Sequence, residues 1–235
     1  MEYEGKDLLL RKFDLWSALS EEEYKELQVL ENTREFSRDE FIYFEAFHHN
    51  QIYFIKKGYI RIGHLDENGN RIIHDILQPG DFFGQLSLDR NDLNGEFAQC
   101  IKSGVSLCSF TVEHFYQLLN RKPQLAIRYS KLAGLRMKRF ENRILNILQK
   151  DIRTRLILFL AQLLRESKYR KRISEITVSI PNYLTHEEIA QLIGSSRQTV
   201  TTQLNLMKES GIFLYSRKEM RYTDIKTKFE WPMPD

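Results

Sequence analysis

Long apolar runs are absent from this 235-residue sequence. No stretch approaches the roughly 18 consecutive apolar residues that a membrane-crossing helix needs. The first residues, MEYEGKDLLLRKFD, also lack the basic-then-apolar order of a signal peptide. We therefore expect a soluble, cytoplasmic protein that has no membrane partner.

Cysteine is scarce as well, and its scarcity excludes several kinds of site. The chain has 2 cysteines, Cys100 and Cys108. They are too few for a disulfide framework or for a four-cysteine zinc or iron–sulfur site. We expect both to be small core residues, and thiol oxidation stays open as an alternative role.

A strong overall charge is also missing, because the formal net charge is only +3. The basic residues are unevenly spread: residues 151–235 contain 14 Lys/Arg and 10 Asp/Glu, whereas the preceding residues contain 21 and 22. This imbalance weakly favours a polyanionic partner for the C-terminal part. The length is sufficient for two modest domains.

Residues 184–207, LTHEEIAQLIGSSRQTVTTQLNLM, have the pattern of two short helices joined by a tight turn. Thr185 and Glu188 form a capping box that starts the first helix. Its apolar face consists of Ile189, Ala190 and Ile193. Gly194 supplies the permissive backbone that a sharp turn requires. The pattern predicts a helix-turn-helix, and an ordinary helical hairpin is the alternative.

The second helix of this pair has one apolar and one polar face. We expect Ser195 or Ser196 to cap it. Its inward residues are Val200, Leu204 and Met207, and its polar face carries Arg197, Gln198, Thr201, Thr202 and Asn205. Arg side chains can bind guanine and Gln side chains adenine with two hydrogen bonds each. The polar face is therefore a candidate DNA-reading surface.

The region 35–110 contains short aromatic and β-branched runs separated by the turn signals KKG, ENGN and QPGD. Strands interrupted this often predict an all-β sandwich or barrel, with the aromatic rings as its core. Before it, Ser20 and Glu23 form a capping box for a helix over 21–30. We expect that helix to cover the β domain through Tyr24, Leu27 and Leu30.

A long helical pattern runs from Pro123 to Gln149. One heptad seam follows it, apolar except at one serine: Ala126, Ser130, Ala133, Met137, Phe140, Ile144 and Ile147. Such a seam favours a parallel partner helix and hence a homodimer. The alternative is that the stripe packs on its own β domain.

The C-terminal part begins with a new helix capped by Asp151. A strand, ITVSI, precedes the helix-turn-helix, and GIFLYSRKEMRYTDI follows it as two strands around a charged turn. This order predicts a winged helix, in which Arg217, Lys218 and Arg221 can touch phosphates or serve as solubilising residues. The expected parts are 1–122, a β-roll sensor, 123–150, a dimerisation helix, and 151–235, a DNA-binding domain.

In this order of parts the chain resembles the Crp/Fnr family of bacterial transcription regulators over nearly its whole length. KKGYIRIGHLDENGNRIIHDILQPGDFFGQLSL resembles the family's cyclic-nucleotide-binding β-roll, with glycines at its turns: Gly58, Gly69, Gly80 and Gly84. GSSRQTV resembles its recognition helix. The resemblance implies an α+β fold with a cupin-like β-roll, a long dimerisation helix and a C-terminal winged helix-turn-helix.

By the same resemblance, Arg197, Gln198 and Thr202 occupy base-reading positions, and Ser196 and Thr199 occupy phosphate-contacting ones. Gln198 stands where many members carry Glu, and Thr202 where many carry Arg, so we expect an unusual operator. The implied partners are double-stranded DNA with an inverted repeat, a second copy of the chain, RNA polymerase as a candidate, and an unidentified small-molecule effector.

The effector pocket departs further from the family. Cyclic-AMP-binding members carry Gly-Glu-Leu and then Arg-Ser, whereas this chain has Gly84-Gln85-Leu86 and then Glu96-Phe97; Phe140 and Glu141 replace hydroxyl residues. A carboxylate in place of an arginine repels a cyclic phosphate. We therefore expect no binding of cyclic AMP. We also expect no haem, which would rest on His74 or Cys100, and no iron–sulfur cluster.

A metal site is the last alternative that the sequence raises. The candidates are His48, His49, His64 and His74, but scattered β-domain histidines are usually structural or exposed. A cupin-like metal-binding protein or enzyme would need a compact His/Glu set on adjacent strands, and no such set is evident. We expect no metal site and no enzyme. A structural dimer whose winged helix binds protein is the third alternative.

Overall fold

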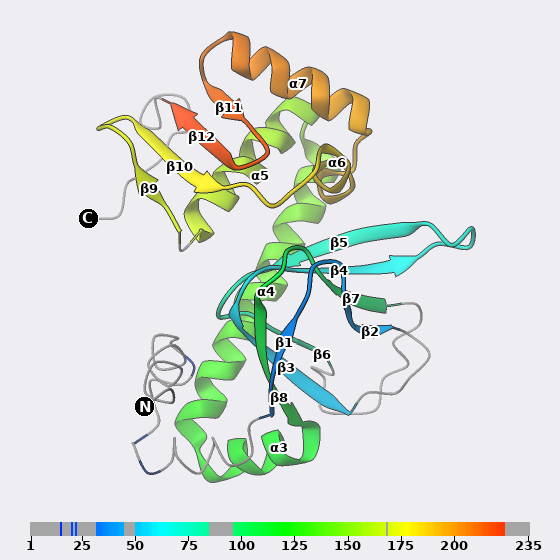
Figure 1. The fold of residues 1–235 in the computed structure, drawn as a ribbon, viewed down its shortest axis with the longest axis vertical. Helices are drawn as coiled ribbons and strands as arrows, with labels where there is room; N and C mark the ends of the chain where they lie inside the picture. The colour runs from blue at the N-terminus through cyan, green and yellow to red at the C-terminus, as the bar shows by residue number, and fades with distance from the viewer. Residues whose placement is uncertain are drawn as a thin grey trace. The chain divides into compact units, whose positions relative to one another are not determined.

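The computed structural model describes residues 32–44, 50–84, 96–167 and 169–223, together with Leu15, Ser20 and Glu22. The chain divides into two compact units, Met1–Arg139 and Phe140–Asp235, shown in Figure 1. The helix expected over 21–30 lies outside the described residues except for Glu22. Within the described ranges, no helix is long and apolar enough to cross a membrane.

The first unit contains two four-stranded antiparallel sheets. The first sheet has the order β1 (Asn32–Phe36), β8 (Val105–Thr111), β3 (Gln51–Lys57) and β6 (Phe82–Gly84). The second sheet has the order β2 (Phe41–Phe44), β7 (Glu96–Cys100), β4 (Ile60–Leu65) and β5 (Arg71–Leu77). The predicted all-β domain is therefore confirmed.

The core of this β-roll lies between the two sheets. Ile55 and Leu107 of the first sheet pack with residues of the second sheet in one buried cluster: Ile60, Ile62, Leu77, Ala98 and Cys100. We call the face of the second sheet that carries these residues its inner face. Because strand side chains alternate between faces, this cluster fixes which residues of β4 and β7 point inward.

Two turn glycines of the β-roll could not be replaced without strain. Gly58 has a φ of 91°, and a Cβ atom there would lie 2.6 Å from Cγ2 of Val105. Gly84 has a φ of 97°, and a Cβ atom there would collide with the carbonyl oxygen of Gln51. Only glycine combines a positive φ with such close backbone approach.

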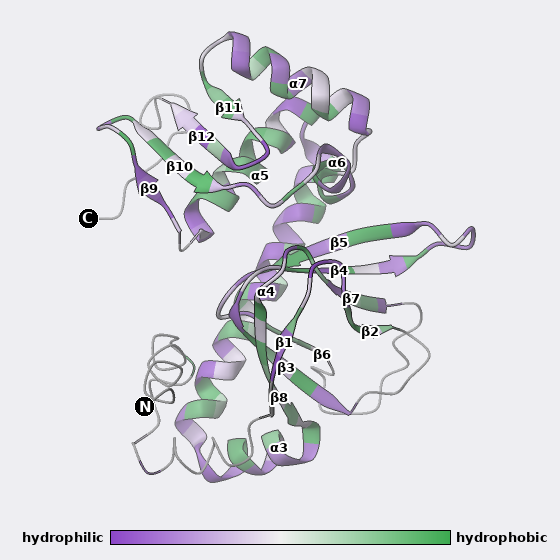
Figure 2. Ribbon diagram, viewed as in Figure 1, coloured by the Kyte–Doolittle hydropathy of each residue, from purple (hydrophilic) through white to green (hydrophobic). Residues whose placement is uncertain are grey.

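Two helices close the outer side of the first sheet. α3 (Val112–Arg121) is capped by Thr111, whose Oγ1 accepts from the His114 backbone N–H at 3.2 Å. α4 (Pro123–Gln149) follows directly. Their apolar side chains cover Ile52, Phe54, Phe82, Cys108 and Phe110 of the sheet with Phe115, Leu119, Leu125, Tyr129 and Leu132. Figure 2 shows the alternation of hydrophobic and hydrophilic residues along both helices.

Charged side chains complete the contact of α4 with its own β-roll. Arg136 pairs with Asp75 at 3.1 Å, and Arg139 pairs with Asp81 at 3.3 Å. Arg136 also donates to the carbonyl oxygen of Phe82 at 3.0 Å. The stripe of α4 that faces the β-roll is therefore distinct from most of the predicted heptad seam.

The middle of that seam faces away from the chain's own core. Ser130 and Ala133 are exposed, as are Met137 (71%) and Ile144 (58%). At the ends of the seam, Ala126 packs against the core of the β-roll, whereas Ile147 lies beside Gly194 of the second unit. The four exposed seam residues therefore do not fit the alternative that the whole stripe covers its own β domain, whereas Phe140 is half-buried.

The second unit is a small winged domain. α5 (Ile152–Glu166) begins at Asp151, whose Oδ1 accepts from the Thr154 N–H at 3.0 Å. Its sheet has the order β11 (Phe213–Tyr215), β12 (Glu219–Thr223), β10 (Thr177–Pro181) and β9 (Lys171–Arg172). The predicted cap and both wing strands are confirmed, and β9 is a short addition that its polar sequence did not indicate.

Candidate nucleic-acid interface and effector pocket

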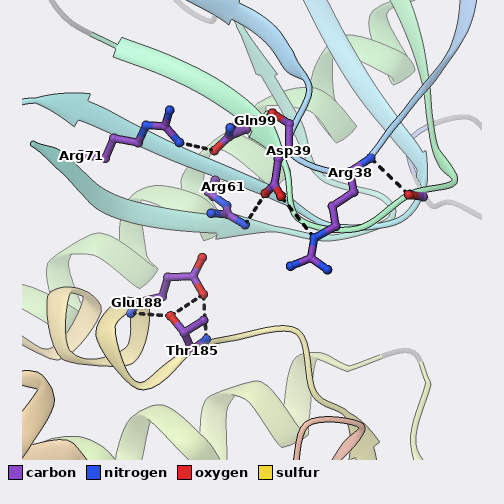
Figure 3. Close-up of polar contacts among 8 residues, drawn as sticks. Arg38, Asp39, Arg61, Arg71, Gln99, Thr185 and Glu188 are labelled. Atoms are coloured by element: carbon purple, nitrogen blue, oxygen red, sulfur yellow. Dashed lines mark hydrogen bonds and ion pairs between the residues drawn. The ribbon is translucent and has the colours of Figure 1, made fainter.

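The turn between the paired helices forms as the sequence predicts. α6 (His186–Ile193) starts at the capping box: the Thr185 N–H donates to Glu188 at 2.7 Å, and the Glu188 N–H donates to the Thr185 hydroxyl at 3.2 Å (Figure 3). α6 ends at Gly194, whose φ of 65° and ψ of 54° lie in the left-handed region. This conformation turns the chain sharply toward the next helix.

The second helix, α7 (Arg197–Glu209), is capped by Ser196, whose Oγ accepts from the Thr199 N–H at 3.2 Å. Of the two serines considered, Ser196 is therefore the cap. Val200, Leu204 and Met207 are at most 3% exposed. The predicted inward face of α7 is confirmed.

The opposite face of α7 presents most of the predicted DNA-reading side chains. Arg197, Gln198, Thr202 and Asn205 are exposed, and Thr199 is half-buried. Arg197 and Gln198 lie in the first turn, where the side chains and free backbone N–H groups of a recognition helix meet DNA. The helix thus combines a buried apolar face with an accessible polar one.

Thr201 is less accessible than the four exposed residues of this face, and its predicted contact with DNA stays a prediction. The residue is half-buried, and its hydroxyl donates to the carbonyl oxygen of Arg197 at 2.8 Å. The same hydroxyl oxygen lies 2.8 Å from Nδ1 of His186. Since the hydroxyl proton is already donated, we assign the proton of this second bond to His186. Thr201 therefore fastens α6 to α7.

His186 is a positioning residue that the sequence did not reveal. Its ring contacts the Tyr215 ring edge-on with centroids 4.8 Å apart, so it links both helices to β11. Burial and the nearby positive charge of Arg197 lower the pKa of His186. The neutral imidazole therefore persists at neutral pH.

Arg155 is a second positioning residue within the winged domain. Its guanidinium donates to the carbonyl oxygens of Ile147 at 2.6 Å and Gly194 at 3.2 Å, and its Nε–H donates to that of Lys150 at 2.8 Å. The end of α4 is thereby tied to the turn of the helix-turn-helix. No sequence motif indicated this contact, because its partners are backbone atoms.

The wing carries two exposed cations at its tip. Arg217 and Lys218 are exposed in a turn held by the Ser216 hydroxyl, which accepts from the Glu219 N–H at 3.0 Å. Arg221 instead binds Glu219 at 2.5 Å within β12. Arg221 is therefore paired inside the wing, and the two tip residues are the better candidates for phosphate contacts.

The predicted effector-pocket residues divide between two faces and two units. Phe97 is fully buried and contacts the rings of Phe41 and Phe44, with centroids 5.7 and 6.4 Å away. Glu96 precedes it on the same strand and points to the opposite, inner face. The placement of Phe97 in the pocket is therefore wrong, because adjacent strand residues alternate.

The structure says less about the other residues predicted to line the effector pocket. Gly84 lies at the end of β6, and Gln85 and Leu86 lie outside the described residues. Phe140 and Glu141 belong to the second unit, so their role in the pocket stays a prediction.

The polar side chains around Glu96 are not those expected of an anion-binding site. Tyr43 donates a hydrogen bond to its Oε1 at 2.5 Å, and His64 is its direct cross-strand neighbour. Burial raises the pKa of Tyr43 well above its usual value, and the adjacent Glu96 carboxylate raises it further. The phenol therefore remains a hydrogen-bond donor. A phosphate placed beside Glu96 would meet a like charge.

The outer face of the same sheet carries a separate polar network. Gln99, which is 2% exposed, accepts from Arg71 at 3.4 Å and donates to the backbone oxygen of Asp39 at 2.8 Å. The Asp39 carboxylate also pairs with Arg61 at 3.4 Å (Figure 3). These bonds give both ends of the buried amide a partner and join β4, β5 and β7 to the turn that precedes β2.

We expect both cysteines to be inert in the folded protein. Burial raises the pKa of Cys100 and that of Cys108 to about 12, and both side chains are fully buried. The reactive thiolate is therefore nearly absent at neutral pH. A thiol reagent such as DTNB should leave the native protein unmodified and react fully after denaturation. Rapid modification without denaturant would contradict this expectation and reopen the redox role.

Both parts of the chain match known protein families. The family model for the cyclic nucleotide-binding domain matches residues 33–122, and that for the Crp-like helix-turn-helix domain matches residues 154–227. The chain is 28% identical to the global nitrogen regulator of Nostoc sp. (strain PCC 7120) over 186 aligned residues. The aligned region covers 79% of this chain and 82% of that regulator.

Solved structures show the same fold. A CooA mutant from Carboxydothermus hydrogenoformans is similar with a TM-score of 0.75 and 22% identity, over 93% of this chain and 95% of that chain. TTHA1359, a transcriptional regulator of the CRP/FNR family from Thermus thermophilus, is similar with a TM-score of 0.64 and 23% identity, over 83% and 95%. Both predicted domains are matched in the predicted order, and the chain belongs to the Crp/Fnr family of transcription regulators.

Proposed function

We propose that this regulator binds an inverted-repeat DNA site as a homodimer and that cyclic AMP is not its effector. The exposed polar first turn of α7 is the observation that carries the DNA proposal. Arg197 and Gln198 stand there on a helix anchored by three buried residues, and the cationic wing tip lies in the same domain. A cupin-like enzyme finds no support in the family matches.

The contacts expected on DNA follow from the chemistry of each side chain. Arg197 is suited to guanine O6 and N7, and Gln198 to adenine N6 and N7. Thr202 and Asn205 extend the same exposed face along the helix. The N–H groups at the start of α7, Arg217 and Lys218 would hold phosphates and fix the helix in the major groove.

The exposed seam of α4 supports the homodimer. Apolar side chains such as Met137 and Ile144 stand exposed on a 27-residue helix. Pairing two such helices would bury these residues and relate the two recognition helices by a two-fold axis. Their half-sites would then lie about one helical turn, roughly 34–36 Å, apart. An effector would act by favouring one arrangement of the paired helices.

The charge of the pocket supports the exclusion of cyclic AMP. Glu96 replaces the guanidinium that the family resemblance would place against a cyclic phosphate, and a buried anion beside a carboxylate is strongly unfavourable. Isothermal titration calorimetry with cyclic AMP should therefore give no binding in the micromolar range. A micromolar dissociation constant would refute this part of the proposal.

Selection of binding sites from a random duplex library tests the DNA proposal directly. The purified full chain would be used without added ligand at near-physiological salt. Recovery of a palindrome with guanine and adenine at the positions facing Arg197 and Gln198 is the expected result. Recovery of no sequence preference would overturn it.

Salt dependence separates DNA binding from a wing that binds protein. For a dimer that neutralises several phosphates, the logarithm of the binding constant should fall linearly with the logarithm of the salt concentration. The slope should be about −0.9 for each phosphate contacted. Fluorescence anisotropy with the selected duplex at rising salt measures this slope. A flat response would favour the alternative of a structural dimer.

Charges placed in the seam are expected to abolish dimerisation. The double variant Met137→Glu and Ile144→Glu would bring carboxylates of both protomers into an apolar interface, at a cost of several kcal/mol. The dimer dissociation constant should rise by at least about 100-fold. Sedimentation velocity at micromolar concentration would then show monomer.

The matched control for this experiment is Leu135→Glu. Leu135 is 55% exposed and lies on the side of α4 away from the seam, so this variant should remain dimeric. A double variant that also sediments as a dimer would place the interface elsewhere.

A further inference from the structure

We propose that His64, His74 and Glu96 form a binding site for a divalent first-row transition-metal ion on the inner face of the β-roll. Their ligand atoms lie within 4.8 Å of one another. No compact His/Glu set on adjacent strands was evident in the sequence, but the structure brings one together. The three residues come from β4, β5 and β7, which are neighbours in the second sheet.

Strand register explains how three residues distant in sequence converge. β4 and β7 pair without a shift, with Ile60 opposite Cys100, Ile62 opposite Ala98 and His64 opposite Glu96. The first two pairs belong to the buried cluster. His64 and Glu96 therefore lie on the inner face two residues beyond Ile62 and Ala98.

A β-bulge brings the third residue into the set. The register between β4 and β5 shifts after the pair of Ile62 and Asp75, so that Gly63 lies opposite Ile73 and His74 is the extra residue. Bulges redirect side chains and are frequent beside functional sites. The His74 ring lies 4.9 Å from the His64 ring, measured between centroids.

The distances suit a metal ion after a small adjustment. Zinc bonds to histidine nitrogen and carboxylate oxygen are about 2.0–2.2 Å long, so tetrahedral ligand atoms lie about 3.4 Å apart. The observed limit of 4.8 Å requires the side chains to move inward by roughly 1 Å or less. All three are half-buried, so an ion can reach them from solvent.

The chemistry of the set favours a transition metal over other ligands. Two imidazoles and one carboxylate suit Zn²⁺, Fe²⁺, Co²⁺ or Ni²⁺, whereas Ca²⁺ and Mg²⁺ prefer oxygen atoms alone. With neutral histidines the set carries a single negative charge, and Glu96 takes part in no ion pair within the described residues. A cation would therefore be attracted to it and an anion repelled.

Tyr43 supplies the supporting contact that metal-binding carboxylates usually have. Its hydroxyl donates to Oε1 of Glu96, which orients the carboxylate and leaves Oε2 for the metal. The Tyr43 ring stacks on Tyr53 and lies near Phe83, with centroids 6.0 and 6.1 Å away. Tyr43 is thus a positioning residue held by the core.

Cobalt titration of the full chain tests the site. After treatment with a chelator, the protein should bind a single Co²⁺ per chain, give visible d–d absorption, and lose that absorption when Zn²⁺ is added. His64→Ala, His74→Ala and Glu96→Gln should each abolish the spectrum. Glu96→Gln keeps the shape of the side chain and can still accept from Tyr43, so it remains decisive if an alanine variant fails to fold.

Controls separate this site from nonspecific histidine binding. His114 is exposed on α3, and its structural bond is through the backbone, so His114→Ala should bind Co²⁺ as the wild type does. Tyr43→Phe should weaken binding by about 10- to 100-fold, as the loss of an outer-shell partner does. Absence of Co²⁺ binding by the wild type, or binding that survives Glu96→Gln, would overturn the proposal.

The site lies in the sensor domain, so the metal ion is our candidate for the effector; this step rests on the proposed function. DNA affinity of the chelated protein should change by at least about tenfold when Zn²⁺ is added, and Glu96→Gln should remove the change. An unchanged affinity in a protein that binds both metal and DNA would overturn the effector role and leave the metal site standing. Metal binding without any DNA binding would instead contradict the proposed function.

Discussion

Replacing Arg197 by alanine is expected to remove most of the sequence selectivity of this regulator. Arg197 is exposed in the first turn of α7, where a bidentate contact to guanine contributes about 1–3 kcal/mol of discrimination. A homodimer loses the contact in both half-sites, so the two losses combine. Competition between the selected duplex and a duplex altered at that guanine measures the effect by fluorescence anisotropy.

Two further variants make this experiment specific. Lys208→Ala removes the same charge from the exposed last turn of α7, so it should leave the base preference intact. Gln198→Glu should shift the preference at the adjacent position from adenine toward cytosine, because a carboxylate accepts from cytosine N4. If Arg197→Ala keeps the wild-type preference, the assignment of α7 as the reading element fails.

Replacing Tyr222 by alanine is expected to lower the free energy of unfolding of the winged domain by a large fraction. Tyr222 is fully buried on β12; its hydroxyl donates to the carbonyl oxygen of Leu160 on α5 at 2.9 Å, and its ring meets Phe213 edge-on at 4.9 Å. Removing a buried aromatic side chain costs about 3–5 kcal/mol. This is a large share of the roughly 5–15 kcal/mol stability of a typical domain. Urea unfolding followed by circular dichroism measures the loss.

The conservative variant separates packing from hydrogen bonding. Tyr222→Phe keeps the ring and should cost only about 0.5–1.5 kcal/mol, the net value of a typical hydrogen bond. Tyr169→Ala, at a tyrosine that is 47% exposed, is the control and should change the stability little. Equal stabilities for Tyr222→Ala and the wild type would mean that β12 does not pack on α5 in solution.

Local signals account for the part of the fold that was predictable. Thr185 with Glu188, Gly194 and Asp151 act on backbone groups within a few residues of themselves, so their sequence pattern specifies the helix ends. The alternation of buried and exposed residues on α7 likewise follows from helical periodicity. The order of the domains followed from the same patterns read along the chain, and the family resemblance rested on that order.

Periodicity did not predict the contacts of two residues assigned to the candidate sites. Thr201 was assigned to the polar face, and helical periodicity did not reveal that its hydroxyl bonds the Arg197 carbonyl oxygen and His186. Phe97 was assigned to the effector pocket together with Glu96, although neighbouring residues of a strand must point to opposite faces. A loop would have allowed both to point inward, and only the structure identified the strand.

The helix-turn-helix, its caps, the exposed polar face of α7 and the seam of α4 could all be predicted from the amino-acid order, because each depends on spacing within one continuous segment. The meeting of His64, His74 and Glu96 could not. Their convergence depends on the order of β4, β5 and β7, on the register between them and on a bulge at His74. Strand order and register are set by packing of the whole β-roll, so no local pattern contains them.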